Sequence, residues 1–521
     1  MCPKVIKFSY HKVFGSLFIL SCLLLNGCVK PPKENTIVIS GPFEAINLDP
    51  ATTGYIFQRL EVLQTLVNVS QTGELTSGLA THWKSVDQGK NWQIQLKDKV
   101  LFHNGKTMTA SDVKQALQIA MRKPGPLKLA QIKTITIKDD LTLNIELTKA
   151  YLPFPSILTN YSTAVLAPES YAQNGEVNQL LATGPYKITE FTPPHRINTQ
   201  LFEQYWAGQP AIKEVEYITG HRSESRAMMV KTRQADIVYN LDPASLNSLN
   251  QASQVKVNLT EIPRTIMLKL NLAEPALADL NVRQAINLAI DRTGITQGIL
   301  KAPNSEANQI FGPVLSQWHI PQQAAIEQNL ATARQLLQQA GWHLNKQGIR
   351  EKQQQPLKLN LITYANRPEL IVIATAIQDQ LSQIGIKLAV NMENSSAIPS
   401  GHADGSLQMA LIARNFGTIG DPLGLILAEF SSLDGGDWGP MNWYNPQVSA
   451  LLNQLPQQTN PEQYRQTAQQ IAKLVMADLP LIPIAYYQQS SAVNQAVEGF
   501  SFDPFERNFN ISKMSVVNHA H

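Results

Sequence analysis

Cysteine is almost missing from this sequence, and its three copies all lie within the first 28 of the 521 residues. A network of intramolecular disulfides and a metal site built from several thiolates are therefore both excluded for the body of the chain. Such cross-links are also unnecessary, because a chain of this length buries enough apolar surface to be stabilised by its core.

A large excess of charge is missing as well. The chain carries 43 lysines and arginines against 40 aspartates and glutamates, a formal net charge of +3. A nearly neutral body provides neither a basic face for nucleic acid nor a polybasic patch for an anionic membrane. Composition is otherwise ordinary for a globular protein, so we expect disorder only at 29–35 and 512–521.

Catalytic and metal-binding motifs are also missing. The chain has no HExxH, P-loop, GxGxxG, GxSxG or EF-hand pattern. The nearest approaches to a metal cluster are His519-Ala520-His521, interpreted as a chain end, and Asp434 to Asp437 (DGGD), interpreted as a loop. We expect a binding protein with no catalytic residue, no metal site and no cofactor; the enzymatic alternative, a secreted hydrolase, lacks any nucleophile or base constellation.

The N-terminus has the pattern of an export signal. Three lysines within the first twelve residues precede an apolar run at 13–25, which is shorter than the ~20 residues of a membrane-spanning helix. Residues 25–28 (LNGC) resemble a bacterial lipobox, in which the cysteine is acylated and becomes the first residue of the mature chain.

We therefore predict a signal peptide at 1–27, lipidation of Cys28 and a lipid-anchored linker at 28–35. The alternative is a plain signal peptide with an ordinary cysteine. The lipid would be the only membrane contact of a periplasmic or cell-surface lipoprotein. Val29 after the cysteine leaves open which membrane would hold it.

Segments of strand and helix periodicity alternate along the remainder of the chain, which predicts an α/β fold. The expected strands are 36–39, 92–96, 134–137, 141–147, 265–270, 357–364 and 408–413. The expected helices have apolar stripes within 113–120, 282–289, 370–381 and 464–475. Thr109 or Ser111 can cap the first of these helices, Gly385 can end the third, and Pro480 can stop the fourth.

Several short segments share their patterns and their order with one protein family. They are 79–83 (LATHW), 89–92 (GKNW), 100–105 (VLFHNG), 109–113 (TASDV), 183–186 (TGPY), 205–208 (YWAG), 281–292 (NVRQAINLAIDR) and 384–386 (IGI). In this order they resemble the family 5 extracellular solute-binding proteins, the dipeptide, oligopeptide and nickel receptors of ABC importers. The resemblance covers most of the mature chain.

The resemblance implies a two-lobed, periplasmic-binding-protein-like clamshell of type II, with an extra subdomain in lobe I at about 76–185. Lobe I would comprise 36–270 and 486–521, and lobe II would comprise 271–485. The protein would act as a monomer that captures a small solute by closure of the lobes and delivers it to ABC permease subunits. A sensor or chaperone on the same fold is the alternative.

The same resemblance leaves the solute open. Thr418 stands where peptide receptors of the family place an aspartate for the peptide ammonium, although Asp421-Pro422 fits their pattern. Nickel receptors hold a chelator's carboxylates with a lobe I arginine, and the corresponding segment 159–168 has none. A peptide, a peptide-sized solute and a metal chelate all remain candidates.

Arg414 is the first candidate for contact with the solute, because a guanidinium can bind a carboxylate through two parallel hydrogen bonds. The alternative role of Arg414 is a structural ion pair with an acid such as Asp421. Phe416, two residues further on, can either stack on the solute or belong to the core. The remaining candidate ligand-binding residues are Thr418, Tyr161, Trp438, Thr53 and Tyr55.

Overall fold

The computed structural model describes residues 35–364, 367–433, 435–436 and 438–517. Several predicted features lie outside these ranges: the signal peptide 1–27, the lipidated Cys28, both acids of the Asp434 to Asp437 loop, and the two terminal histidines. No helix in the described ranges is both long enough and apolar enough to cross a membrane.

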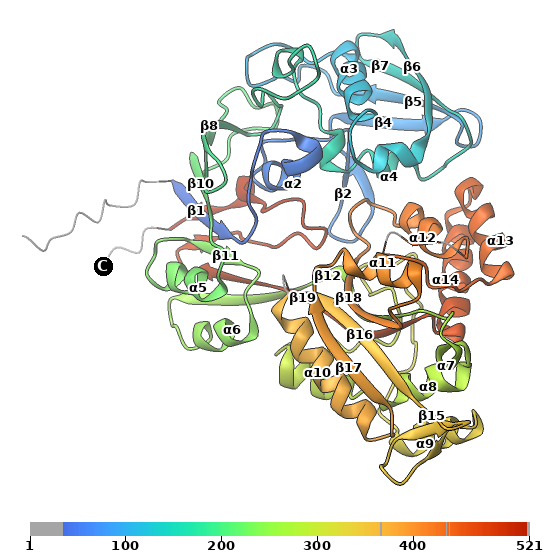
Figure 1. Ribbon diagram of the computed structural model, residues 1–521. Coiled ribbons are helices and arrows are strands. Elements are labelled where there is room, and N and C mark those ends of the chain that lie inside the picture. Colours follow the sequence, from blue (N-terminus) through green and yellow to red (C-terminus); the bar gives the residue numbers. More distant parts are fainter. Residues whose placement is uncertain (1–34, 365–366, 434, 437, 518–521) are drawn as a thin grey trace, which may run out of the picture.

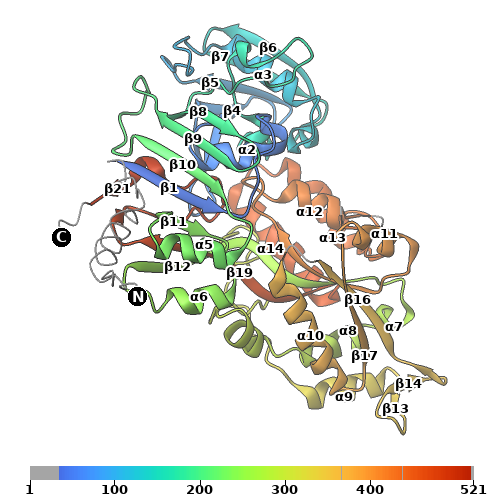
Figure 2. The ribbon, with the colours of Figure 1, turned by 60° about the vertical axis from the view of Figure 1, so that its left-hand side comes forward.

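The chain forms two lobes joined by long strands (Figure 1). One mixed sheet of ten strands extends through both lobes (Figure 2). Its strands are, in spatial order, β17 (Lys387–Glu393), β16 (Lys358–Tyr364), β18 (Met409–Asn415), β12 (Val255–Leu270), β19 (Leu481–Asn494), β11 (Ile237–Tyr239), β1 (Thr36–Gly41), β10 (Glu214–Thr219), β9 (Arg196–Leu201) and β8 (Tyr186–Thr192).

Lobe I adds a second, four-stranded sheet to its end of the large sheet. That sheet comprises β4 (Ala80–Ser85), β5 (Asn91–Leu96), β7 (Thr142–Leu147) and β6 (Ile132–Asp139). The other lobe I elements are β2 (Val67–Val69), β3 (Leu75–Ser77), β20 (Val497–Glu498), β21 (Ser515–Val516), α2 (Pro50–Arg59), α3 (Ala110–Ala120), α4 (Phe154–Ile157), α5 (Ser223–Lys231), α6 (Pro243–Leu249) and the short helical turns Pro126–Ala130, Tyr161–Thr163, Pro168–Ser170 and Ile511–Lys513.

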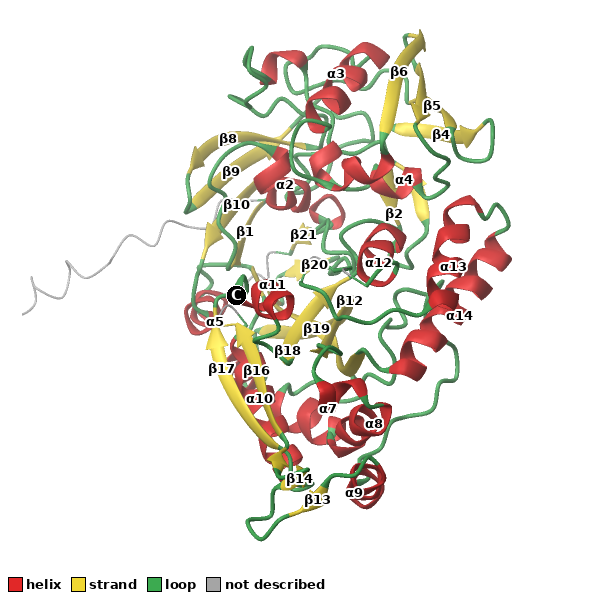
Figure 3. Cartoon of the chain, turned by 45° about the vertical axis from the view of Figure 1, so that its right-hand side comes forward, coloured by secondary structure: helices red, strands yellow, loops and turns green. Residues whose placement is uncertain are grey.

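Lobe II is richer in helices, which flank its part of the large sheet (Figure 3). They are α7 (Pro275–Ala278), α8 (Leu280–Ala289), a π-helical turn (Gly294–Ile299), α9 (Leu330–Gln339), α10 (Pro368–Ser382), α11 (Ala397–Asp404), α12 (Leu423–Phe430), α13 (Pro446–Gln454), a 3₁₀ turn (Leu455–Gln457) and α14 (Pro461–Asp478). A small sheet of β13 (His343–Leu344), β14 (Arg350–Lys352) and β15 (Gln355–Pro356) completes the lobe.

Strands β12 and β19 belong to both lobes. In lobe II, β12 pairs with β18 over Arg264–Leu270, and in lobe I, β19 pairs with β11 at its Ser491 end. The β12–β19 ladder itself is broken between Glu261 and Thr265, where Pro263 has no N–H to donate. The lobe boundaries at 270/271 and 485/486 stay a prediction, but this interruption marks where the paired strands can bend.

The lobes touch each other directly. The Asn160 side-chain nitrogen donates to the Thr418 carbonyl oxygen at 2.8 Å, and the Gly420 N–H donates to the Thr159 hydroxyl at 3.2 Å. A third bond joins the Leu152 N–H to the Pro456 carbonyl oxygen at 2.8 Å. These bonds link the subdomain of lobe I to the α12 and α14 side of lobe II, so the clamshell is closed on this side.

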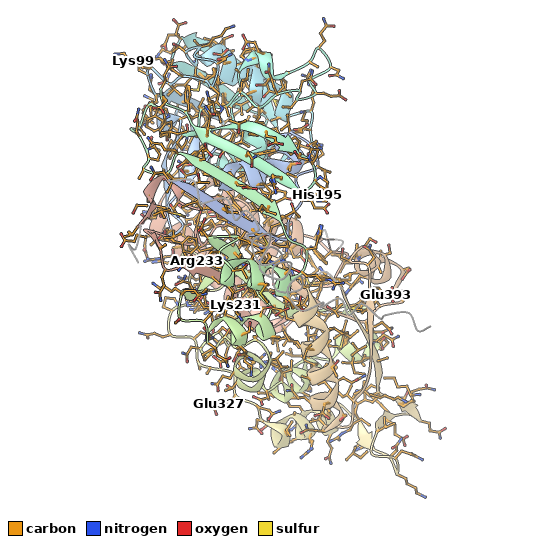
Figure 4. All side chains as sticks on the ribbon, turned by 90° about the vertical axis from the view of Figure 1, so that its left-hand side faces the viewer. Lys99, His195, Lys231, Arg233, Glu327 and Glu393 are labelled. Carbon is orange, nitrogen blue, oxygen red and sulfur yellow. The ribbon has the colours of Figure 1, made fainter. Side chains whose placement is uncertain are left out.

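Charged side chains are spread over the exposed surface of both lobes. Figure 4 shows Lys99 and His195 on lobe I, and Glu327 and Glu393 on lobe II, all at the surface. This distribution agrees with the small net charge of +3.

All the expected strands and helices are present at the predicted places. Leu479, with a left-handed φ of 51°, ends α14 just before Pro480. One expectation is wrong: residues 512–517 are ordered, because β21 pairs with β20 and the Ser512 N–H donates to both Glu61 carboxylate oxygens at 3.2 Å. The C-terminal segment is thus part of lobe I.

The N-terminus of α3 provides a stability test. The Asp112 carboxylate accepts hydrogen bonds from the backbone N–H and the hydroxyl of Thr109, at 2.8 and 2.9 Å. Asp112→Ala is expected to lower the free energy of unfolding by about 1 kcal/mol, the usual cost of losing a helix cap. Chemical denaturation measures this change, with Asp98→Ala at an exposed position as the control that should not shift.

Candidate functional site

Two predicted residues, Thr53 and Tyr55, lie on α2 of lobe I. The Tyr55 ring meets the Tyr161 ring edge to face at a centroid distance of 6.0 Å, and burial raises the pKa of both phenols. Thr53 is 1 % exposed, and its hydroxyl donates to the Asn47 side-chain oxygen at 3.1 Å. The structure therefore brings Tyr55 and Tyr161 together, while Thr53 is engaged inside lobe I.

Arg59 ends α2, where a cation is favoured by the helix dipole. Its guanidinium lies 5.4 Å from the centre of the Phe43 ring and 5.7 Å from that of Tyr239. Arg59 Nε donates to the Glu506 carbonyl oxygen at 2.6 Å, and Nη2 lies 3.2 Å from Glu506 Oε1. Nη1 is buried and has no hydrogen-bond partner among the described residues.

Glu506 joins Arg59 to the strands that connect the lobes. Its second carboxylate oxygen lies 2.8 Å from Nη2 of Arg264, which directly follows Pro263 on β12. Burial alone would raise the pKa of Glu506, but Arg264, Arg59 and Arg367 together hold that pKa below its usual value. Glu506 is therefore a buried carboxylate between two buried guanidinium groups.

Tyr487 on β19 continues this chain of contacts into lobe II. Its ring lies between two guanidinium groups, 5.2 Å from that of Arg264 and 5.1 Å from that of Arg367. The Tyr487 hydroxyl accepts from Arg367 Nη1 at 3.1 Å and donates to Glu369 Oε1 at 3.1 Å. Burial raises the pKa of the phenol well above its ordinary value, so it stays a donor.

Arg414 lies at the end of β18 in lobe II. Its guanidinium is 3.9 Å from the Glu429 carboxylate and 6.0 Å from the centre of the Phe416 ring. Among the described residues, the acid beside it is Glu429, whereas the Asp421 carboxylate accepts from the Tyr464 hydroxyl at 2.6 Å. Burial raises the pKa of Asp421, and this residue belongs to the start of α12.

The other lobe II candidates differ in their surroundings. Phe416 is 1 % exposed and packs against Phe311 at a centroid distance of 5.1 Å, so its ring belongs to the core. Trp438 is half-buried, and its ring packs against that of Tyr364 at a centroid distance of 5.5 Å. Thr418 is exposed and is bonded through its carbonyl oxygen to the opposite lobe. Whether these residues contact solute stays a prediction.

Sequence reasoning missed the residues that form the centre of this arrangement: Arg59, Arg264, Arg367, Glu506 and Tyr487. The one available signal was the segment 262–271 (IPRTIMLKLN), a buried strand that contains an arginine. Within the described ranges, no group of three or more His, Cys, Asp and Glu residues is placed to hold a metal ion.

Comparison with known proteins identifies the family of this chain. The profile of the bacterial extracellular solute-binding proteins, family 5 Middle, matches residues 74–436, more than half of the sequence. The chain belongs to this family. The family 5 resemblance expected from the motifs is thus confirmed, and the fold is the expected two-lobed clamshell built around a large mixed sheet.

Its curated relatives include receptors for different solutes. The nickel-binding protein NikA of Staphylococcus aureus is 26 % identical over 92 % of this chain and 94 % of its own length. The probable D,D-dipeptide-binding periplasmic protein DdpA of Escherichia coli is 26 % identical over 93 % and 95 %. These relatives are binding proteins and not enzymes.

Solved structures give the same picture. The nickel ABC transporter protein of Bacillus halodurans is 25 % identical, with a TM-score of 0.80 over 93 % of this chain and 100 % of the other. The Brucella suis NikA in complex with Fe(III)-EDTA is 22 % identical, with a TM-score of 0.83 over 92 % and 100 %. The second of these likenesses concerns the fold alone.

Proposed function

We propose that this family 5 receptor captures a peptide-sized solute that carries at least one carboxylate, and that the solute is held between the lobes and delivered to ABC permease subunits. The observation that carries the proposal is the row of buried arginines from lobe I to lobe II: Arg59, Arg264 and Arg367. Their described carboxylate partners are Glu506 and Glu369.

This row of arginines is suited to an anionic solute. Among the described residues, its three guanidinium groups meet two carboxylates. Arg59 Nη1 is buried and unpaired in the same ranges, and a buried donor is costly to leave unpaired. Charge-assisted bonds from guanidinium to carboxylate are strong and directional. A solute carboxylate would supply the charge and the acceptors that the protein does not provide.

Two classes of solute satisfy this chemistry. One is a peptide, held through its C-terminal carboxylate. The other is a metal ion carried as cargo by a chelator whose carboxylates bind the arginines. Staphylococcus aureus NikA has been crystallised with Ni(L-His)2, and AppA of Bacillus subtilis with a nonapeptide, so both classes occur among the proteins similar to this chain.

Capture would proceed by hinge closure. The broken ladder between β12 and β19 lets the lobes rotate, and the bonds from Asn160 and Thr159 to the opposite lobe form only when they approach. A solute in contact with both lobes favours the closed state through this difference in contacts. The movement would take place between lobe I, at 36–270 and 486–521, and lobe II, at 271–485.

A thermal-shift panel tests the proposed class of solute. Ni(II) with L-histidine, Fe(III)-EDTA, a dipeptide and a nonapeptide are each added to the purified protein, because a ligand that binds only the folded state raises its melting temperature. Each peptide is matched with its C-terminally amidated form. Stabilisation by a carboxylate-bearing probe and its loss on amidation are expected; equal stabilisation by a peptide and its amide would contradict the proposal.

The proposal includes export and anchoring. Signal peptide 1–27 would be removed, and acylated Cys28 would hold a monomeric protein at the membrane by its lipid alone. Cys28→Ser is expected to move the protein from the membrane to the soluble fraction, because the lipid provides the only apolar anchor. Fractionation with metabolic palmitate labelling measures this; a variant that stays on the membrane would show that another segment anchors it.

A further inference from the structure

A cavity lies in lobe I, outside the row of arginines. Its volume is about 440 Å³, within the range of roughly 300–1,000 Å³ that is usual for small-molecule sites. It is bounded by α2, the β2–β3 hairpin and the C-terminal segment 503–513. In Figure 1 this segment, in dark red, runs beneath α2; the Phe509 N–H donates to the Arg59 carbonyl oxygen at 3.1 Å.

Six of the residues that line this cavity carry carboxamide side chains: Gln58, Gln64, Gln71, Asn68, Asn508 and Asn510. Each carboxamide offers an acceptor and two donors in one plane. Hydroxyl groups of a solute need the same combination, since each of them donates one hydrogen bond and accepts others. A lining with several carboxamides therefore matches a ligand that is rich in hydroxyl groups.

Charge in the lining is balanced, which disfavours an ionic ligand. Glu61 and Asp503 are matched by Arg507 and Lys513. Asp503 lies 3.7 Å from Arg507, and Glu61 accepts from the Ser512 N–H. The cavity thus differs from the row of arginines, whose guanidinium groups exceed their described carboxylate partners.

Some buried polar atoms of the residues that line this cavity have no hydrogen-bond partner among the described residues. Gln58 is 7 % exposed, and its side-chain oxygen has no hydrogen-bond partner within the described part of the chain; the same holds for Arg507 Nε. Nearly all buried polar atoms in proteins are hydrogen-bonded. A ligand hydroxyl that donates to Gln58 would remove one of these exceptions.

Two adjacent aromatic residues, Tyr205 and Trp206, form an aromatic corner in the lining. Trp206 Nε1 donates to the Gln64 side-chain oxygen at 3.2 Å, and Gln64 Nε2 donates to the Tyr205 hydroxyl at 3.0 Å. The two rings lie 5.2 Å apart. They come from the YWAG segment at 205–208, so this family motif builds a fixed apolar surface beside polar groups.

We propose that this cavity is a second solute site, which takes a neutral polyhydroxylated molecule of the size of a mono- or disaccharide. The carboxamides bind its hydroxyl groups, and the aromatic corner faces its carbon skeleton. The site is separate from the anionic solute site: Gln58 and Arg507 line the cavity, whereas their neighbours Arg59 and Glu506 belong to the row of arginines.

Calorimetry and saturation-transfer NMR on the full mature chain test the proposal, with glucose, galactose, maltose and trehalose as probes. At least one probe is expected to bind at millimolar concentration or below. Gln58→Leu and Gln71→Ala are each expected to weaken this binding about tenfold or more. Gln58 already lacks a partner for its oxygen and Gln71 is exposed, so neither change should disturb the fold.

Two controls make the result decisive. Gln338→Leu changes an exposed carboxamide on α9 of lobe II and should leave sugar binding unchanged. The double variant Arg59→Gln/Glu506→Gln should also retain it, whereas binding of carboxylate probes is lost. The proposal is overturned if no probe binds, if both cavity variants bind like wild type, or if the double variant alone loses the sugar.

Discussion

Glu506→Gln is expected to lower the free energy of unfolding by about 3–5 kcal/mol, the usual cost of removing one partner from a buried ion pair. The side chain of Glu506 is 10 % exposed, and its carboxylate lies between the buried guanidinium groups of Arg59 and Arg264. The variant leaves both cations without their shared counter-charge. Denaturant unfolding followed by circular dichroism measures the loss.

The matched control is Glu462→Gln, which removes a carboxylate from an exposed pair with Arg465 on α14. Exposed pairs of this kind contribute about 0–1 kcal/mol, so this variant should unfold nearly like wild type. Equal stabilities of the Glu506 and Glu462 variants would show that the buried pair adds little to the fold.

The stabilisation from Glu506 should also depend on pH. Because its pKa is lowered in the folded state from the ordinary value of 4.5, its contribution is complete above that value. It is lost as the pH falls from 4.5 through the lowered folded-state pKa. Wild type should therefore lose stability more steeply in acid than Glu506→Gln; parallel pH profiles would contradict the pairing.

The double variant Arg59→Gln/Glu506→Gln is expected to lose most of its solute. It removes Glu506 together with one of its two cations, so only Arg264 is left without its counter-charge, and circular dichroism checks that the variant folds. One guanidinium fewer for the solute carboxylate should cost about 2 kcal/mol or more in binding, which is at least about thirtyfold in affinity. The amount of solute that co-purifies per protein molecule, measured by native mass spectrometry, reports the change.

A pair-for-pair control accompanies this experiment. Glu462→Gln/Arg465→Gln neutralises the exposed pair on α14 and should carry as much solute as wild type. If the Arg59/Glu506 variant folds and still carries a full load, Arg59 does not contact the solute and the row of arginines is structural.

Most of the fold could be predicted because its signals are local. The capping of α3 by Thr109 and Asp112 and the end of α14 before Pro480 each depend on residues that are close in sequence. The order of the family motifs then selected one architecture. The error at 512–517 has the opposite cause: this segment is ordered by contacts with Glu61, 451 positions away.

The candidate site could be predicted only in part, for the same reason. Arg414, Tyr55 and Tyr161 were proposed through family segments, and their contact with solute stays a prediction. The bonds of Glu506 to Arg59 and to Arg264 join residues separated by 447 and 242 positions, and no local pattern indicates such a pairing. Phe416 is buried, and its ring packs on Phe311. From the sequence alone, a place in the core and contact with the solute were equal alternatives for this ring.

Native mass spectrometry of the protein purified from its own host, followed by mild denaturation to release its solute, tests the central claim most directly. The account predicts a released molecule with at least one carboxylate, either a peptide or the chelator of a metal ion. A cation released without a carboxylate-bearing chelator, or a neutral molecule released as the only solute, would contradict the assignment of Arg59, Arg264 and Arg367 to solute binding.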